Sequence, residues 1–77
     1  MNNKDDLIKK IIAESLEIDE EIIKPSSRIT EDLGADSMDK FELVHDISEG
    51  TGIDLQEGVD AKWTTVQDIY NYMEKLS

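Results

Sequence analysis

Hydrophobic residues recur with helical spacing near the start of the chain. They stand one and four positions apart, so they fall on one stripe of a helix, with charged residues off that stripe. Asn3 precedes the stripe and can cap a helix, and acidic residues follow it where the helix dipole favours them. The pattern predicts a first helix over residues 4–17. The stripe consists of Leu7, Ile8, Ile11, Ile12 and Leu16.

The next segment, residues 18–36, has no sustained period and contains the only proline of the chain, Pro25. A loop of this length in a small domain is usually functional or anchored to the core. We expect one helical turn over residues 20–23. The predicted anchors of the loop are Ile22, Ile23, Ile29 and Leu33.

Helical periodicity returns after this loop. A second helix is predicted to begin at Ser37, with Asp36 as its N-cap, and to end at the break Gly50-Thr51-Gly52. A short third helix is expected over residues 56–61.

The last helix has a clear start and a clear apolar face. Thr64 and Gln67 are spaced as a capping box, which predicts the start of the helix. Tyr70 lies on its apolar stripe, while Tyr72 is expected to be exposed. Trp63, just before the helix, is expected to pack in the core or at its rim. The stripe consists of Val66, Ile69, Tyr70, Met73 and Leu76.

These elements predict an all-α fold in one domain over residues 1–77. We expect a small bundle of three main helices plus one short helix, with a long loop between helices one and two. No strand alternation, internal repeat or linker competes with this prediction. The chain has no cysteine, so its stability must come from a small aliphatic core.

The net charge of the chain limits the kinds of partner that it can bind. The formal net charge is -11, which disfavours nucleic acid and anionic membranes as partners and favours basic protein surfaces. The first residues show no signal peptide, and no apolar run reaches the roughly 20 residues needed to span a bilayer. The alternative interpretation of the acidity is that it simply keeps a small protein in solution. We expect a cytoplasmic protein, a monomer and no metal site.

The second helix has three faces. One arc is apolar and predicts a core contact through Leu43, Val44 and Ile47. A second arc is a continuous ridge of carboxylates, and a third carries apolar residues beside that ridge. An acidic helix surface is usually just solvated, but exposed Met and Phe beside it favour a partner interface. The ridge consists of Asp39, Glu42, Asp46 and Glu49, and the third face of Met38, Phe41 and His45.

Ser37 stands at the first turn of this helix, where a serine is often only a favourable terminus residue. It is a poor candidate for a nucleophile, because the only histidine, His45, lies about 12 Å along the helix axis and on another face. It suits the attachment of a phosphodiester, since helix N-termini favour anions. Asp36 and Asp39 oppose an anion slightly, which suggests that they serve recognition by a modifying enzyme.

The segment Leu33-Gly34-Ala35-Asp36-Ser37-Met38 closely resembles the modification motif of acyl carrier proteins. The resemblance extends to Ile11-Ile12-Ala13-Glu14, to Glu42-Leu43-Val44 and to Thr64-Thr65-Val66-Gln67-Asp68, and so covers nearly the whole chain. The Gly-Ala-Asp-Ser sequence is similar to discrete carriers of the type II fatty-acid or polyketide-synthase kind.

The resemblance implies a carrier, not an enzyme. It implies that a phosphopantetheinyl transferase attaches 4'-phosphopantetheine to Ser37, and that the arm holds an acyl chain as a thioester for acyl-synthesis enzymes with basic docking surfaces. The partner contacts implied by the family are Asp36, Met38, Asp39, Phe41, Glu42 and Glu49. The residues implied to line an acyl cavity are Leu43, Val44 and Ile47.

Two alternatives remain open at this point. The chain could be an unmodified acidic adaptor that binds basic partners through the same ridge. It could also be a specialised carrier outside general fatty-acid synthesis, because Lys40, His45 and Ser48 depart from the family's usual pattern on this helix.

Overall fold

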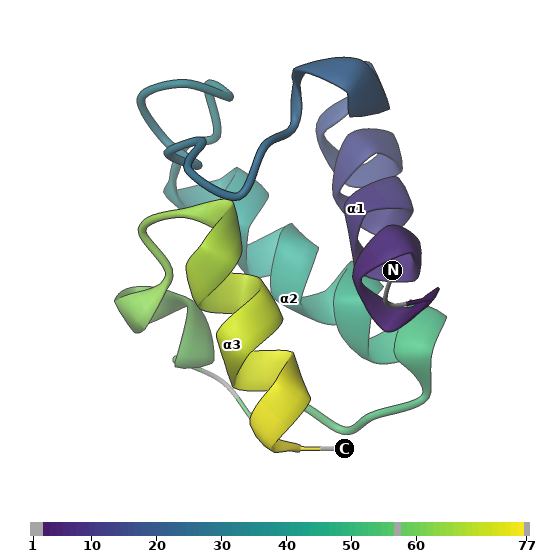
Figure 1. Ribbon diagram of the computed structural model, residues 1–77. Helices are drawn as coiled ribbons and strands as arrows, with labels where there is room; N and C mark the ends of the chain where they lie inside the picture. Colours follow the sequence, from purple (N-terminus) through teal and green to yellow (C-terminus); the bar gives the residue numbers. More distant parts are fainter. Residues whose placement is uncertain (1–2, 57, 77) are drawn as a thin grey trace.

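The computed structural model describes residues 3–56 and 58–76, and three α-helices form its frame (Figure 1). They are α1 (Asn3–Leu16), α2 (Ser37–Thr51) and α3 (Val66–Lys75). Two short 3-10 turns, η1 (Glu20–Ile22) and η2 (Val59–Lys62), lie in the connections. The all-α prediction is confirmed: within the described ranges there is no strand, only an isolated bridge between Arg28 and Thr65.

The helices meet around an aliphatic core. In Figure 1, α3 lies in front, α2 crosses behind it, α1 stands beside them, and the long loop passes over the top. The predicted stripe of α2 is buried, as is most of the stripe of α3. Burial of such side chains contributes about 1.5–3 kcal/mol each, which is the main stabilising term in a domain without cysteines. The largest fully buried side chains are Trp63, Ile8, Ile12, Ile29, Leu43, Ile47, Ile69, Met73 and Val66.

The long loop is fastened to the start of α3 by backbone hydrogen bonds. The Ile29 N–H donates to the Thr64 carbonyl at 2.9 Å, and the Val66 N–H donates to the Ser27 carbonyl at 3.0 Å. Ile23, Ile29 and Leu33 anchor it to the core as predicted. The prediction for Ile22 was wrong, because η1 turns this side chain outward and leaves it 51% exposed.

The start of α3 differs from the prediction. The box at the start of α3 lies one residue later, between Thr65 and Asp68, because Asp68 rather than Gln67 stands where its carboxylate reaches back to the N-cap N–H. α2 ends within the predicted break: its last residue is Thr51, and Gly52 caps it in the left-handed conformation, with a φ of 74°. The predicted capping by the Asn3 side chain lies outside the described part of the chain.

The segment between α2 and α3 also differs. The short α-helix predicted over residues 56–61 is a 3-10 turn that begins at Val59, because Gly58 has a φ of 90° and cannot continue a right-handed helix. Residue 57 of that predicted helix lies outside the described residues. Tyr72 is half-buried rather than exposed, because its ring packs edge-on against Trp63 with the centroids 6.0 Å apart. Trp63 itself lies in the core, as predicted.

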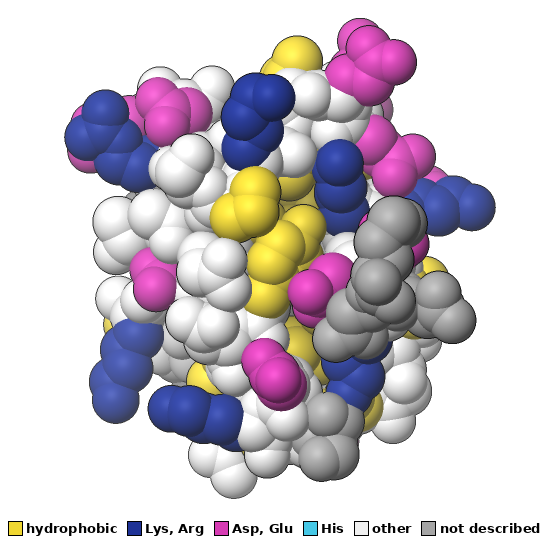
Figure 2. All heavy atoms as spheres, viewed as in Figure 1, with side chains coloured by type: hydrophobic (Ala, Val, Ile, Leu, Met, Phe, Trp, Pro, Cys, Tyr) yellow, Lys and Arg dark blue, Asp and Glu magenta, His cyan; other side chains and the backbone are white. Residues whose placement is uncertain are grey.

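The surface is mixed in charge on the side seen in Figure 2. Apolar side chains reach that surface in a narrow strip between α3 and α1, among scattered basic and acidic residues. None of the helices described is long and apolar enough to cross a bilayer.

Candidate functional site

Ser37 is exposed at the first position of α2, immediately after an N-cap that holds the helix start in place. The Asp39 N–H donates to Asp36 Oδ1 at 2.8 Å, and the Asp36 N–H donates to Asp39 Oδ2 at 3.2 Å. The carboxylate of each of these two residues thus accepts the backbone N–H of the other. Sequence reasoning predicted Asp36 as the cap but missed the reciprocal bond, which an acidic residue three positions after the cap could have indicated.

The residues just before Ser37 are fixed by the loop. Gly34 has a φ of 76°, a conformation that strongly favours glycine, and this turn directs Ala35 into the core. The Ala35 N–H donates to the Ile29 carbonyl at 3.1 Å. The serine is therefore presented on a rigid support, although it follows a segment without regular structure.

Arg28 organises the outer side of that loop. Its guanidinium lies 2.8 Å from a carboxylate oxygen of Glu31 and 3.7 Å from one of Asp32, and the backbone N–H of Arg28 donates to Asp32 Oδ2 at 2.8 Å. All three side chains are about half exposed or more, so the ion pairs contribute little to stability. Their role is to shape the turn that leads to Gly34.

The histidine of α2 makes its contact elsewhere. His45 Nε2 lies 3.2 Å from Glu49 Oε1, four residues on and further from the serine, and both side chains are exposed. This geometry agrees with the expectation that Ser37 has no histidine base within reach. Among the described residues no group of three or more His, Asp or Glu side chains is arranged to hold a metal ion.

The partner face predicted on α2 combines exposed apolar side chains with acidic side chains. Met38 is 73% exposed and Phe41 59% exposed, which is unusual for large apolar residues in so small a protein. Glu42 and Glu49 are exposed beside them, while Asp39 is half-buried at the cap. The opposite side of the helix is the buried core stripe, so α2 has one inward face and one outward face with mixed chemistry.

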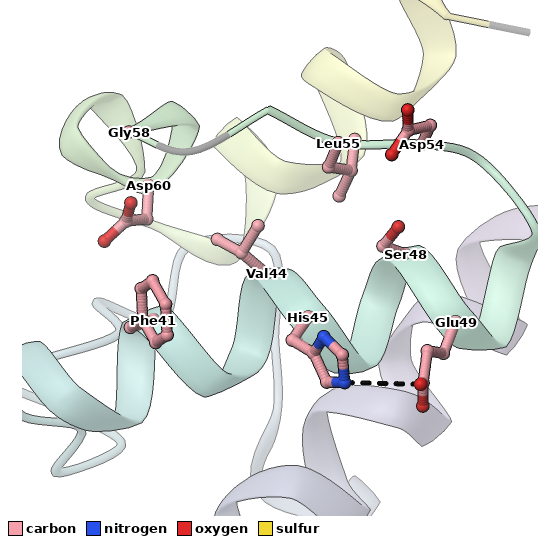
Figure 3. Close-up of a pocket in the computed structure, with 9 residues that line it drawn as sticks. All are labelled: Phe41, Val44, His45, Ser48, Glu49, Asp54, Leu55, Gly58 and Asp60. Atoms are coloured by element: carbon pink, nitrogen blue, oxygen red, sulfur yellow. Dashed lines mark ion pairs between the residues drawn. The ribbon is translucent and has the colours of Figure 1, made fainter.

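A cavity of about 350 Å³ opens along α2. Figure 3 shows Leu55 directed toward α2 from the segment before η2, with Val44 and Ser48 directed back toward it. Of the three residues predicted to line an acyl cavity, Val44 lines this one, while Leu43 and Ile47 are fully buried in the core. The sequence did not reveal the wall opposite α2, which Asp54, Leu55, Gly58 and Asp60 form. The lining residues are Phe41, Val44, His45, Ser48, Glu49, Asp54, Leu55, Gly58 and Asp60.

The serine end of α2 fits a covalently attached phosphate group. Ser37 has an exposed hydroxyl, and it stands where the free N–H groups and the dipole of a 15-residue helix favour a negative charge.

Comparison with known proteins identifies the family. The family described as "Phosphopantetheine attachment site" matches residues 6–73. The chain is 39% identical over 71 residues to an acyl carrier protein of Campylobacter lari, covering 92% of each chain. It is also 38% identical over 69 residues to that of Campylobacter concisus, covering 90% of each. The chain belongs to the acyl carrier protein family.

Membership of the acyl carrier protein family gives the site its chemistry. The cofactor is 4'-phosphopantetheine, held covalently, and the role of the chain is to carry acyl groups. This confirms the family and the cofactor that the sequence motif predicted. The all-helical fold and the long loop of the structure agree with that membership.

Proposed function

We propose that Ser37 is the attachment residue and that the chain carries acyl intermediates as thioesters in the biosynthesis of fatty acids or related lipids or polyketides. The observation that carries this proposal is the exposed Ser37 hydroxyl at the capped N-terminus of α2, within the segment that matches the family. A carrier of this kind is not itself an enzyme, in keeping with a serine whose nearest histidine is engaged with Glu49 further along the helix.

The residues around Ser37 each have a part in holding the arm. When bound, the 4'-phosphopantetheine group supplies a terminal thiol that carries the acyl group. The Ser37 oxygen becomes the ester oxygen of the phosphodiester and fixes the arm to α2. The N-terminal N–H groups of the helix favour the phosphate charge by about 0.3–1 kcal/mol at an exposed position. The box between Asp36 and Asp39 keeps this helix end ordered.

The outward face of α2 is the proposed docking surface. Its carboxylates would steer enzymes with basic surfaces toward Ser37, and its exposed apolar side chains would be covered in the complex. The phosphopantetheinyl transferase and the acyl-synthesis enzymes are the proposed partners. The proposed contact residues are Asp36, Met38, Asp39, Phe41, Glu42 and Glu49.

The cavity along α2 is the proposed place for the acyl chain. Val44 lines it directly. Leu43 and Ile47 lie in the core on the same helix, and we propose that they form the apolar backing of this region.

Intact-mass measurement tests the attachment. Incubation with coenzyme A and a phosphopantetheinyl transferase is expected to add one phosphopantetheinyl group to the protein. Ser37→Ala should abolish the addition, because it removes the accepting oxygen. Ser26→Ala, at another exposed serine, is the matched control and should be modified like the wild type. Modification of the Ser37→Ala protein would contradict the assignment.

The same serine variant separates the carrier from the adaptor alternative. An unmodified adaptor would bind its basic partner equally well with Ser37→Ala, and the wild type would gain no mass. Exposed Met38 and Phe41 are compatible with both functions, so the serine and not the acidic face makes the distinction.

A further inference from the structure

The lining of the cavity along α2 contains more polar side chains than a site for a plain hydrocarbon chain needs. Phe41, Val44 and Leu55 supply its apolar wall. The remaining side chains that line it are polar or charged: His45, Ser48, Glu49, Asp54 and Asp60. A hydrocarbon in contact with these groups would displace water from them without offering a hydrogen bond.

Some of these polar groups already have partners. His45 pairs with Glu49, and the Ser48 hydroxyl donates to the Ile53 carbonyl at 2.8 Å. Asp54 and Asp60 differ, since their carboxylates have no hydrogen bond or ion pair with any described residue. The cavity therefore presents two carboxylates that a cation or hydrogen-bond donor could engage.

The two carboxylates are placed along the path that a group tethered at Ser37 would follow. Phe41 stands one turn from Ser37, about 6 Å along the axis, and Ser48 stands about 16 Å along it. In Figure 3, Asp60 lies over Phe41, near the Ser37 end, and Asp54 lies further along, above Ser48. Both line the same cavity, with Leu55 between them in the chain segment that closes it.

We propose that this cavity takes an acyl group bearing a protonated amine, whose ammonium pairs with Asp54 or Asp60 while its methylenes lie against Phe41, Val44 and Leu55. This inference rests on the proposed attachment at Ser37 and names the class of cargo. An ammonium keeps its charge paired on entering the cavity, whereas an alkyl end of the same size leaves both carboxylates less solvated and unpaired.

The size of the preference follows from the exposure of the site. Asp54 is exposed and Asp60 half-buried, so solvent screens each pair. A partly exposed pair changes the equilibrium of insertion up to about fivefold. High salt should reduce this preference, because it screens the attraction.

The test compares two matched cargoes on the intact protein. The transferase loads Ser37 with amide-linked pantetheine analogues carrying either a 6-aminohexanoyl or a heptanoyl group, which differ only by ammonium in place of methyl. Amide chemical shifts of residues lining the cavity, measured against the bare arm, report insertion. We expect the amino group to shift them and to populate the inserted state severalfold more than the alkyl group does.

Charge variants locate the effect. Asp54→Asn with Asp60→Asn keeps the side-chain shape and should equalise the two cargoes. Glu21→Gln removes one charge from an exposed position on η1 outside the cavity and should leave the preference unchanged. The amide spectrum of each variant, which should otherwise match that of the wild type, verifies the fold.

The outcomes are distinct. Equal or stronger insertion of the heptanoyl group overturns the inference, as does an amino preference that survives in the double variant. An attached arm with no cavity shifts from either cargo also overturns it, while the proposed function stands. Failure of intact mass to show an arm on Ser37 overturns both.

Discussion

At the scale of single residues, two carboxylates decide where α2 begins. The sequence predicted Asp36 as the N-cap and suggested a recognition role for Asp36 and Asp39, and the structure adds that each of the two carboxylates accepts the other residue's backbone N–H. The start of the helix fixes the position of Ser37. The same two residues thus combine a structural role with a proposed role in partner binding.

Removal of the cap should therefore cost stability as well as binding. We expect Asp36→Ala to lower the free energy of unfolding by about 1 kcal/mol, because the Asp39 N–H loses its acceptor. In a domain of this size that corresponds to a fall in melting temperature of about 4–8 °C, measured by circular dichroism. Glu42→Ala, at an exposed position of the same helix without a cap bond, should change it much less. A melting temperature equal to that of the wild type would refute the role of the cap.

A second cap makes stability depend on acid pH. The backbone N–H groups of Thr65 and Thr64 donate to the Asp68 carboxylate, at 2.9 and 3.0 Å, and lower its pKa below the ordinary value of 3.8. A depressed folded-state pKa stabilises the protein above the unfolded pKa, and this contribution disappears as pH falls through the folded value.

The Asp68→Asn variant tests this dependence. It should be less stable than the wild type at neutral pH, and the difference should shrink below about pH 3.8, where the wild-type carboxylate takes up its proton. Urea denaturation at neutral pH and below pH 3.8 measures the difference in unfolding free energy between the two proteins. Asp19→Asn, next to η1, is the control because its side chain makes no cap bond. A difference that stays constant with pH would count against the assignment.

At the scale of elements, the contact between α1 and α2 depends on a glycine inside α2. A Cβ built on Gly50 would stand 2.5 Å from Ile11 Cδ1 and 3.0 Å from Ile11 Cγ1. Gly50, the first residue of the predicted break, therefore lies inside α2 and permits the close approach of the two helices. The helix ends at Thr51, and the left-handed Gly52 caps it.

A larger residue at this position should separate the helices. Gly50→Val is expected to destabilise the protein by about 1–3 kcal/mol through overpacking against Ile11. Ile11→Ala should make room for the valine, so the double variant should lose less stability than the sum of the two single changes. Chemical denaturation of all four proteins gives this coupling, and simple additivity would show that the contact is unimportant.

The outward face of α2 allows a test of docking without a change in stability. Because Glu42 is exposed, Glu42→Lys should alter unfolding by no more than about 0.5 kcal/mol. It should nevertheless slow modification of Ser37 by a transferase with a basic surface severalfold, and weaken the salt dependence of the rate. Glu21→Lys on η1 has the same charge change off this face and serves as control. Equal rates for the two variants would remove Glu42 from the docking surface.

At the scale of the whole molecule, the large negative net charge destabilises the folded state. A formal net charge of -11 on 77 residues produces self-repulsion in the folded state. The melting temperature should rise as salt is added from low ionic strength, since screening weakens that repulsion. Replacing Glu20 and Glu21 with lysine reduces the negative charge on an exposed turn and should flatten this dependence. A melting temperature independent of salt in the wild type would contradict the argument.

The sequence alone determined the three long helices and the serine motif, because both depend on local signals. Apolar spacing identified the buried faces of α2 and α3, and the residues around Ser37 resembled one family closely enough to predict its cofactor. Local signals placed the capping box of α3 at Thr64, one residue too early, and predicted that Ile22 is buried. Both features depend on the residues around them.

The tertiary structure decided the features that join distant segments. Hydrogen bonds to the start of α3 hold the long loop that presents Ser37, and Ile11 explains why Gly50 stands inside a helix. The cavity exists only because the segment of Asp54 and Asp60 folds over α2. Periodicity along one helix cannot reveal the wall opposite it, since that wall depends on packing between residues far apart in the chain.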